Sequence, residues 1–496
     1  MSNKLNIMLV ASEVVPFAKT GGLADVAGAL PKALEKLGHN VIVVMPRYYI
    51  VDKEKYNLKP LEGALGVPMG VMGELWCMVF EGKIPGCNVP VYFIEYEGFF
   101  GRSGLYDENN LSYGDNDNRY VFLSKAAMQT AKKLRFKPDV IHANDWHTAA
   151  IPLFLNTSYL WDSDFEDTAS ILTIHNLQHQ GKFYKGLMDV MGVGWEHFTP
   201  QELEEFDGVN LLKGGIANCD ILTTVSKRYA HEIQTSEFGW GLEHIIQSHN
   251  DKLFGILNGV DYDEWSPAVD KFIAQNYDAD DLSGKKVCKR ELQKHFGLPQ
   301  RDDVPVIGLV GRLAEQKGIG LLAESIWSML EMDIQIVLLG SGESWAEDMF
   351  NHVAHWKRDK FACHIGYDNA LSHKIEAGSD FFLMPSLFEP CGLNQIYSLR
   401  YGTLPIVRAV GGLDDTIENY DPYSKSGTGF KFYEASGRAL LGTVKWAIDT
   451  WYNDKDAIDT LIQNAMAKRF DWESSAKAYE DIYRLAIAKR KCKKYQ

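Results

Sequence analysis

Short runs of apolar residues recur along the first half of the chain and alternate with stretches of helical periodicity. The runs are rich in Val and Ile and span residues 6–10, 41–45, 89–94, 139–142, 170–175 and 221–225. Apolar runs without polar alternation are typical of strands buried on both faces, as in a parallel sheet covered by helices. The first half therefore predicts a doubly wound α/β domain.

The same rhythm restarts after about residue 255, with strand-like runs at 305–310, 334–339, 381–384 and 405–407. A chain of 496 residues is too long for one core, because single cores stop growing near roughly 250–300 residues. We therefore expect two α/β domains, 1–255 joined by a C-terminal helix over 475–496, and 256–474. Residues 254–261 and 266–284 predict a hinge followed by a helical connection.

Composition and charge narrow the classes of function. Hydrophobic residues make up 46% and charged residues 24%, a mixture typical of a globular enzyme. The formal net charge of −15 argues against general binding to nucleic acid or an anionic membrane, since each needs a broad basic surface. The basic run at 489–494 fits a surface patch or, more simply, cations that complement a helix C-terminus. An anionic ligand must therefore meet a local basic pocket.

The seven cysteines are scattered without Cys-x-x-Cys spacing, which favours a reducing compartment. The first residues run directly into a strand, with no signal or transit segment before it. No apolar run approaches the ~20 residues of a membrane-spanning helix. We therefore expect a soluble cytoplasmic protein.

Glycine-rich loops follow several of the predicted strands. The first strand leads into Lys19-Thr-Gly-Gly22, where glycines allow close approach of a phosphate and Lys19 supplies a mobile cation. This loop matches neither the Walker pattern nor the Gly-x-Gly-x-x-Gly fingerprint of dinucleotide folds. Taken alone, it fits an anion cradle or an ordinary structural turn.

Three more loops in the second half have phosphate-compatible chemistry. Arg312 and Lys317 follow one strand, and Glu389 precedes Gly392-Leu393 after another. The segment from Gly411 to Thr416 repeats the pattern after a third strand. Ligands of open α/β sheets bind at the carboxyl ends of strands. Each loop alone also fits a solvated helix start, but together they predict a nucleotide-sugar site.

A catalytic metal is poorly supported. His175 and His179 are four residues apart, but His175 ends a strand, so the two rings need not share a face. His142 and His147 do not have zinc-site spacing, and the pair Asp261 and Asp263 lies in the expected hinge. We therefore expect no metal or other cofactor, and phosphate charge met by Lys, Arg and helix ends.

In order and spacing, these segments resemble the glycogen and starch synthases over nearly the whole chain. The resemblance rests on Lys19-Thr-Gly-Gly-Leu-Ala-Asp-Val26, His142-Ala-Asn-Asp-Trp-His147, Thr173-Ile-His-Asn176, Leu257-Asn-Gly-Val-Asp261, Gly311-Arg-Leu313, Gln316-Lys-Gly318, Gly366-Tyr367, Glu389-Pro-Cys-Gly-Leu393 and Gly411-Gly-Leu413. It implies two Rossmann-like domains facing a deep cleft, the B-type glycosyltransferase fold. It also implies glucose transfer with retention from a nucleotide sugar to an α-1,4-glucan, that is, glycogen or a malto-oligosaccharide. The absent transit segment favours the bacterial form, whose usual donor is ADP-glucose.

The resemblance also implies roles for single residues. Arg312 and Lys317 would neutralise the departing diphosphate, and Glu389 would hold the glucosyl hydroxyls. Lys19 and Gly22 would contact the donor diphosphate or the acceptor region. The remaining members of the expected site are His175 under the reacting sugar, Asp145 and Asn258 lining the acceptor and donor sides, Tyr367 stacked on adenine, and Gly392, Leu393 and Thr416 on the donor.

Two positions depart from relatives of this family. Tyr397 stands where many retaining relatives have a second acidic residue, eight positions after the first. His179 stands where a Tyr is usual, which affects an acceptor contact. Three alternatives remain: a UDP-glucose-dependent transferase of the same fold, a pyridoxal-phosphate phosphorylase, which would be much longer, and a non-catalytic glucan-binding relative.

Overall fold

A computed structural model describes residues 4–108 and 111–494. The chain forms two compact units. The first comprises residues 1–225, 230–259 and 472–496, and the second comprises 226–229 and 260–471. The units thus divide four residues later than the expected boundary after residue 255, and the last helix begins at Trp472.

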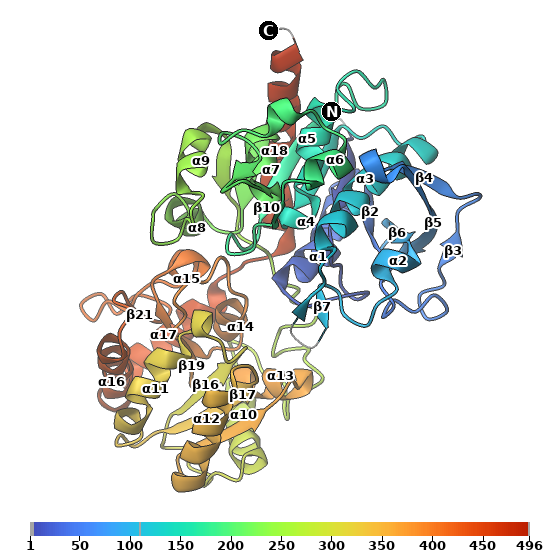
Figure 1. The fold of residues 1–496 in the computed structure, drawn as a ribbon. Coiled ribbons are helices and arrows are strands. Elements are labelled where there is room, and N and C mark those ends of the chain that lie inside the picture. The colour runs from blue at the N-terminus through green and yellow to red at the C-terminus, as the bar shows by residue number, and fades with distance from the viewer. Residues whose placement is uncertain (1–3, 109–110, 495–496) are drawn as a thin grey trace. The chain divides into compact units, whose positions relative to one another are not determined.

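The first unit is built on a ten-stranded sheet (Figure 1). Seven strands run parallel in the order β15-β14-β10-β9-β1-β2-β6. Their bounds are β1 Asn6–Val10, β2 Asn40–Pro46, β6 Pro90–Glu95, β9 Val140–Asn144, β10 Ala169–Ile174, β14 Ile221–Thr224 and β15 Leu253–Gly255. The six predicted strands are confirmed, and β1 and β9 flank the point where the strand order reverses.

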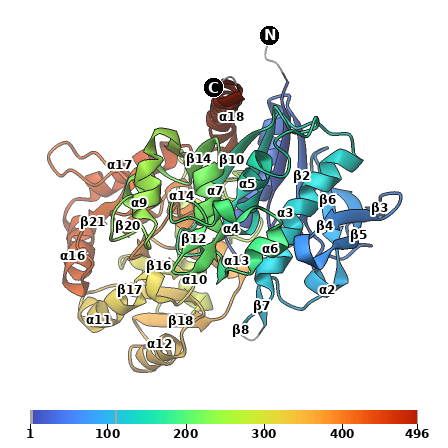
Figure 2. The ribbon, with the colours of Figure 1, turned by 45° about the horizontal axis from the view of Figure 1, so that its top comes forward.

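An antiparallel extension completes this sheet beyond β6, as Figure 2 shows. It consists of β5 (Glu74–Lys83), β3 (Lys59–Pro60) and β4 (Leu65–Pro68). Shorter strands of the unit are β7 Asp107–Glu108, β8 Leu111–Ser112, β11 Lys182–Tyr184, β12 Glu204–Glu205 and β13 Gly208–Asn210. The sequence patterns did not predict these elements, because most of them are short or partly exposed.

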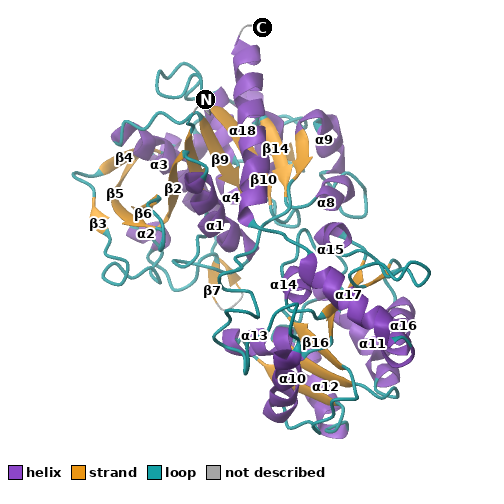
Figure 3. Cartoon of the chain, turned by 180° about the vertical axis from the view of Figure 1, so that it is seen from behind, coloured by secondary structure: helices purple, strands orange, loops and turns teal. Residues whose placement is uncertain are grey.

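Helices cover both faces of the first sheet. Helix α18 (Trp472–Lys494) packs on α1 (Gly22–Lys36) and β10, on the face turned toward the viewer in Figure 3. Helices α3 (Asn116–Lys133) and α5 (Ala150–Asn156) cover the other face. The remaining helices are α2 Glu97–Phe100, α4 Asp145–Thr148, α6 Leu187–Met191, α7 Leu211–Asn218, α8 Lys227–Glu232 and α9 Glu243–Ser248. This two-sided cover explains why the parallel strands are apolar throughout.

The second unit has a six-stranded, fully parallel sheet in the order β18-β17-β16-β19-β20-β21. Its strands are β16 Val306–Val310, β17 Gln335–Gly340, β18 Phe361–Ile365, β19 Phe381–Met384, β20 Leu404–Arg408 and β21 Phe430–Phe432. The four predicted strands are confirmed, while β18 and β21 were not predicted. Here the strand order reverses between β16 and β19, which places the loops after these two strands side by side.

One helix of the second unit precedes its first strand, and the others lie between the strands or after the last one. The helices are α10 Ser283–His295, α11 Ile319–Met329, α12 Ser344–Trp356, α13 Asn369–Gly378, α14 Asn394–Arg400, α15 Gly411–Thr416, α16 Gly437–Asn453 and α17 Lys455–Ala467. Helices α10 and α13 pack on each other, as do α11 and α16. The sheet therefore lies between helical layers, as in a doubly wound fold.

The segment from 266 to 282 differs from the expected helical connection. It has no helix and instead packs on α13 and α14 as part of the second unit. The Asp270 carboxylate accepts hydrogen bonds from His373 at 2.8 Å and from Tyr401 at 2.5 Å. The Trp265 ring stacks between His373 and Tyr397, with centroid distances of 3.7 and 3.9 Å. The polar composition predicted a helical connection after a hinge, but buried polar partners hold the segment in a non-helical conformation.

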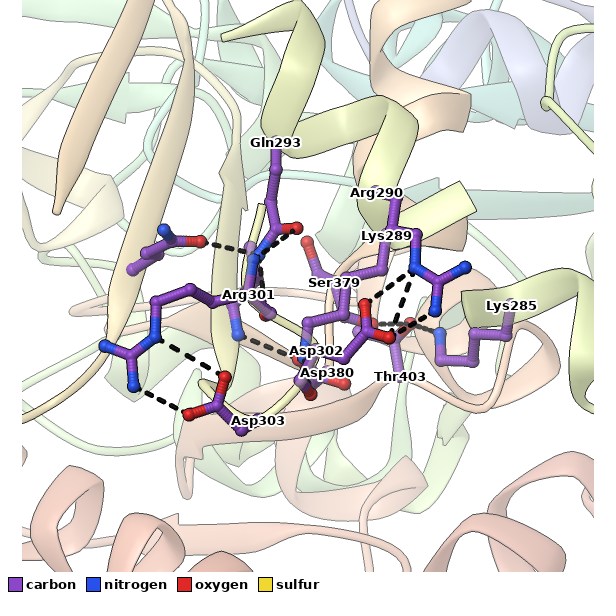
Figure 4. Close-up of polar contacts among 12 residues, drawn as sticks. Lys285, Lys289, Arg290, Gln293, Arg301, Asp302, Asp303, Ser379, Asp380 and Thr403 are labelled. Carbon is purple, nitrogen blue, oxygen red and sulfur yellow. Dashed lines mark hydrogen bonds and ion pairs between the residues drawn. The ribbon is translucent and has the colours of Figure 1, made fainter. Parts of the chain in front are cut away.

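Charged side chains join α10 to the amino ends of the second sheet (Figure 4). Lys289 lies 2.7 Å from the Asp380 carboxylate, which also accepts the backbone N–H of Val306. Lys285 donates to the hydroxyl of Thr403 at 2.7 Å. Asp380 precedes β19 and Thr403 precedes β20, so this network lies at the amino ends of the strands. It stabilises the end of the sheet opposite the carboxyl ends, where ligands bind.

Candidate functional site

A pocket of about 230 Å³ lies in the second unit, at the carboxyl ends of β16 and β19. Its floor is formed by Leu and Met side chains of the sheet and by α11. Its polar wall is formed by Arg312, Lys317, Ser386, Glu389 and Asn394, together with Gly311, Gly392 and Leu393. The structure thus brings five of the expected site residues together at the topological switch point, because loops distant in sequence follow neighbouring strands.

Lys317 and Glu389 are directly paired in this pocket. The Lys317 ammonium lies 2.6 Å from the Glu389 carboxylate, whose same oxygen also accepts from the Ser386 hydroxyl at 3.0 Å. The Glu389 side chain is 8% exposed and that of Lys317 is 27% exposed. Both charges are therefore held at fixed positions in a partly dry site. Ser386, which the sequence interpretation did not single out, orients the carboxylate.

Close backbone contacts shape the two loops. The Gly412 N–H donates to the carbonyl oxygen of Glu389 at 3.0 Å. A Cβ on Gly412 would lie 1.9 Å from the Cys391 carbonyl oxygen, so no other residue fits there. A Cβ on Gly318 would lie 1.9 Å from the Pro385 carbonyl oxygen. The glycines of the sequence motifs therefore allow three loops to pack against each other and hold Glu389 in place.

Arg312 and the start of α14 complete the rim. Arg312 is exposed, and its guanidinium donates to the Gln316 side chain at 3.2 Å. The Asn394 amide donates to the Val310 carbonyl oxygen at 2.9 Å, which ties α14 to the end of β16. Gly392 adopts a positive φ of 70° just before this helix. A ligand in the pocket thus contacts the exposed Arg312 cation, the Lys317 cation that is paired with Glu389, and backbone groups at the Gly392 turn.

Two expected donor residues of the second unit, Tyr367 and Thr416, do not line this pocket. Tyr367 follows β18, which lies two strands from β16, and its side chain is 86% exposed. Its ring is accessible for stacking. Thr416 is buried, and its hydroxyl donates to the Gly412 carbonyl oxygen at 2.6 Å. That hydrogen bond stabilises the backbone at Gly411 and Gly412 from its buried side.

In the first unit, Glu13 organises the loop between β1 and α1. Its buried carboxylate accepts from the Thr20 hydroxyl and the Tyr106 hydroxyl, both at 2.6 Å, and from the Gly21 N–H at 3.1 Å. The Thr20 N–H also donates to it. Sequence analysis missed Glu13, although a carboxylate three residues after a predicted strand was a usable signal. The Glu13 carboxylate therefore fixes the glycine-rich loop by hydrogen bonds on the buried side of the loop.

The exposed side of that loop carries Lys19 and Gly22. Lys19 is exposed and pairs with Asp25 at 2.7 Å, and Gly22 is the first residue of α1. A Cβ on Gly21 or Gly22 would meet no atom within 4 Å, and the φ of Gly21 is an ordinary −145°. The fold itself therefore does not require glycine at either position.

Asp145 and His175 meet at the ends of β9 and β10. The Asp145 carboxylate accepts the backbone N–H of His175 at 2.7 Å, and the His175 ring contacts the Asn144 side chain at 2.9 Å. Burial raises the pKa of Asp145 to about 7, although backbone N–H donors oppose the shift, and it lowers the pKa of His175 to about 3. Asp145 also has a positive φ of 53°. The imidazole is therefore neutral at pH 7.

Asn258 lies near the end of the first unit and is 6% exposed. Its side-chain oxygen is buried without a hydrogen-bond partner among residues 4–108 and 111–494. An unpaired buried acceptor is costly, so this oxygen is suited to accept a donor from outside the described chain.

The raised pKa of Asp145 makes stability depend on pH. The folded protein holds this proton more tightly than the unfolded chain, whose value is near 3.8, so the stabilising contribution is lost as pH rises through about 7. We expect Asp145→Asn to become more stable relative to wild type by about 3 kcal/mol as the pH rises from 5 to 7, with little further change up to pH 8. Asn tolerates the positive φ. Urea unfolding at several pH values measures the difference, and parallel stability curves would contradict the assignment.

In the part of the chain that the structure describes, no three His, Cys, Asp or Glu side chains are grouped so that they could hold a metal ion. His142 is instead buried, with its ring nitrogens bonded to Tyr483 and Thr173. All seven cysteines lie outside disulfide bonds. None of the helices within 4–108 and 111–494 has the length and apolar character needed to span a membrane.

Two family models match the chain. The model described as the starch synthase catalytic domain matches residues 6–248, and the one described as glycosyl transferases group 1 matches residues 291–468. Together with the two doubly wound units and the polar pocket at a switch point, they define a glycosyltransferase of the B-type fold. Similarity to individual proteins identifies the family within this class.

Close relatives match over nearly the whole chain. Glycogen synthase 1 of Geobacter metallireducens is 58% identical over 98% of this chain and 97% of its own. A glycogen synthase of Anaeromyxobacter sp. is 46% identical over 98% of this chain and all of its own. The chain belongs to the glycogen and starch synthase family.

Solved structures agree with this assignment. The catalytic domain of starch synthase IV from Arabidopsis thaliana, bound to ADP and acarbose, superposes with a TM-score of 0.89 at 33% identity and covers 98% of this chain and all of its own. Sucrose-phosphate synthase from Thermosynechococcus elongatus superposes with a TM-score of 0.58 at 17% identity, which shows a shared fold.

Proposed function

We propose that this protein transfers glucose from ADP-glucose to the non-reducing end of an α-1,4-glucan, such as glycogen or a malto-oligosaccharide, with retention of configuration. The observation that carries the proposal is the partly buried Lys317–Glu389 pair in the pocket at the ends of β16 and β19. The glycogen synthases at 58% and 46% identity support the acceptor class. The ADP bound to the starch synthase IV domain supports the nucleotide.

On the donor side, the pocket supplies the electrostatics that the reaction needs. Cleavage of the bond between C1 and the phosphate leaves an oxocarbenium-like sugar and concentrates negative charge on the diphosphate. In this proposal Arg312 and Lys317 stabilise that charge as it develops, which is usually the largest catalytic contribution. Glu389 holds the glucosyl hydroxyls, the N–H groups of Gly392 and Leu393 contact phosphate oxygens, and Tyr367 stacks on adenine.

The remaining expected residues belong to the first unit. In this proposal His175 lies under the reacting sugar, and Asp145 and Asn258 contact the acceptor and donor. Lys19 and Gly22 contact the donor diphosphate or the acceptor region. The open space at Gly21 and Gly22 supports a ligand contact, because a backbone without Cβ atoms allows a ligand to approach it closely. Attack occurs on the face that the leaving group vacates, and the diphosphate accepts the acceptor's proton.

The proposal includes two further statements. No metal ion or other cofactor is needed, because the cations at the donor site are Arg312 and Lys317. The protein acts in the cytoplasm, a compartment that keeps free thiols such as the exposed Cys492 reduced. Both statements are tested separately from the transfer reaction, by chelation and by localisation of the tagged protein.

Incorporation of labelled glucose into glycogen tests the proposal. We expect strong incorporation from ADP-glucose, much weaker incorporation from UDP-glucose, and no loss when a chelator is present. A preference for UDP-glucose would identify the UDP-dependent transferase of the same fold. Loss of activity in chelator would contradict the metal-free mechanism. No incorporation from either donor would favour a non-catalytic glucan-binding protein.

A further inference from the structure

Asn144, the last residue of β9, is fully buried between β1 and β10. Its amide nitrogen donates to the backbone carbonyl oxygens of Val10 at 3.1 Å and His142 at 3.2 Å. Its amide oxygen lies 2.9 Å from Nε2 of His175. One side chain thus joins the ends of two strands to the residue that follows β10.

These contacts determine which end of the amide faces His175. In the reverse orientation, the amide oxygen would lie against two carbonyl oxygens, and none of the three can donate a hydrogen bond. Leaving such buried groups unsatisfied costs about 1–3 kcal/mol each. The amide oxygen therefore faces the ring. Because an amide oxygen only accepts, Nε2 of His175 must carry a proton.

The ring has only this one proton near neutral pH. Burial lowers the pKa of His175 to about 3, so the imidazole is neutral. Its Nδ1 then has a lone pair, and this atom has no hydrogen-bond partner within residues 4–108 and 111–494. Of the titratable neighbours, Asp145 binds the backbone N–H of His175 and His142 is buried with a pKa near 3. Neither competes for the ring proton.

We propose that Asn144 is a positioning residue that fixes the Nε2–H tautomer of His175 and leaves Nδ1 as a hydrogen-bond acceptor for a hydroxyl of the reacting sugar. The tautomer follows from the contacts of Asn144 together with the burial that keeps the ring neutral. The choice of a sugar hydroxyl as partner rests on the proposed function. The opposite tautomer would present an N–H at Nδ1, which cannot accept from a hydroxyl.

The tautomer can be measured directly by nitrogen-15 NMR of the full chain labelled at histidine. The His175→Gln variant identifies the His175 signals among the 14 histidines. We expect the wild-type ring to show a protonated Nε2 and an unprotonated Nδ1, unchanged between pH 6 and 8. A protonated Nδ1 would overturn the proposal whether or not any variant folds.

Asn144→Leu tests the positioning role. We expect mixed tautomers at His175 and a fall in kcat of about 10- to 100-fold with little change in KM, the scale seen when the partner that orients a metal-bound histidine is removed. The matched control is Asn156→Leu, which removes a half-buried amide bonded to Asn218 and Arg490 of the same unit. The control should keep the wild-type tautomer and kcat.

The tautomer measured by NMR and the kcat of Asn144→Leu distinguish a failure of this inference from a failure of the proposed function. If Asn144→Leu keeps a single Nε2–H tautomer and full kcat, Asn144 is not a positioning residue. If the wild-type ring shows the expected tautomer but no glucose is transferred from any donor, the proposed function fails and the tautomer assignment stands.

Discussion

Lys317→Ala and Glu389→Ala are each expected to lower kcat for glucose transfer by about 10²–10³-fold, the usual loss when one group that stabilises transition-state charge is removed. The 2.6 Å contact between the two side chains places both charges in the same pocket. Loss of Lys317 leaves the developing diphosphate charge less compensated. Loss of Glu389 removes the carboxylate that we assign to the glucosyl hydroxyls. Initial rates with ADP-glucose and glycogen measure both effects.

The control for these variants is a pair of the same chemistry on the surface. Lys455 and Asp459 form an exposed ion pair on α17 at 2.9 Å. Lys455→Ala and Asp459→Ala should leave kcat unchanged, because exposed pairs contribute little. All four variants should keep the circular dichroism spectrum of the wild type. Near-normal turnover in both Lys317→Ala and Glu389→Ala would show that the pocket is not the catalytic donor site.

Gly318→Ala is expected to destabilise the protein by about 2–4 kcal/mol and to abolish most of the activity. Gly318 has a positive φ of 70°, and an added Cβ would lie 1.9 Å from the Pro385 carbonyl oxygen. The loop that carries Lys317 must then move away from the loop that carries Glu389. Thermal unfolding measures the loss of stability, and calorimetric titration with ADP measures the loss of affinity.

Gly320→Ala is the matched control, two residues further along. Gly320 lies in the first turn of α11, and a Cβ there would meet no atom within 4 Å. Alanine is a better helix former than glycine, so the variant should be as stable as wild type or more stable by up to about 1 kcal/mol. Equal stability of both variants would mean that the close approach of Gly318 and Pro385 does not exist in solution.

Much of the fold was predictable from local patterns. The ten predicted strands are all present, because a strand buried on both faces is apolar at every position. Strands β18 and β21 escaped prediction. In β18 the residues are mostly half-exposed, which follows from its place at the sheet edge, and β21 is only three residues long. The 266–282 segment was misread because its partners, such as His373 and Tyr401, lie about 100 residues away or more.

Part of the candidate site was also predictable from local sequence patterns. Arg312, Lys317 and Glu389 were found because each lies in a loop directly after a predicted strand. Glu13 was missed although its place three residues after a predicted strand was a usable signal, and Ser386 and Asn144 were missed because a lone hydroxyl or amide has no local signature. Their importance is visible only in their contacts with Gly21, Glu389 and His175.

The sequence by itself determined the class of fold, the positions of the loops that carry chemistry and the family to which the chain belongs, because apolar periodicity and motif spacing are local properties of the chain. Only the tertiary structure decided which loops meet. Parallel sheets place non-consecutive strands side by side, so the pairing of Lys317 with Glu389 and the orientation of His175 by Asn144 depend on strand order. Strand order is set by long-range packing, which no short segment encodes.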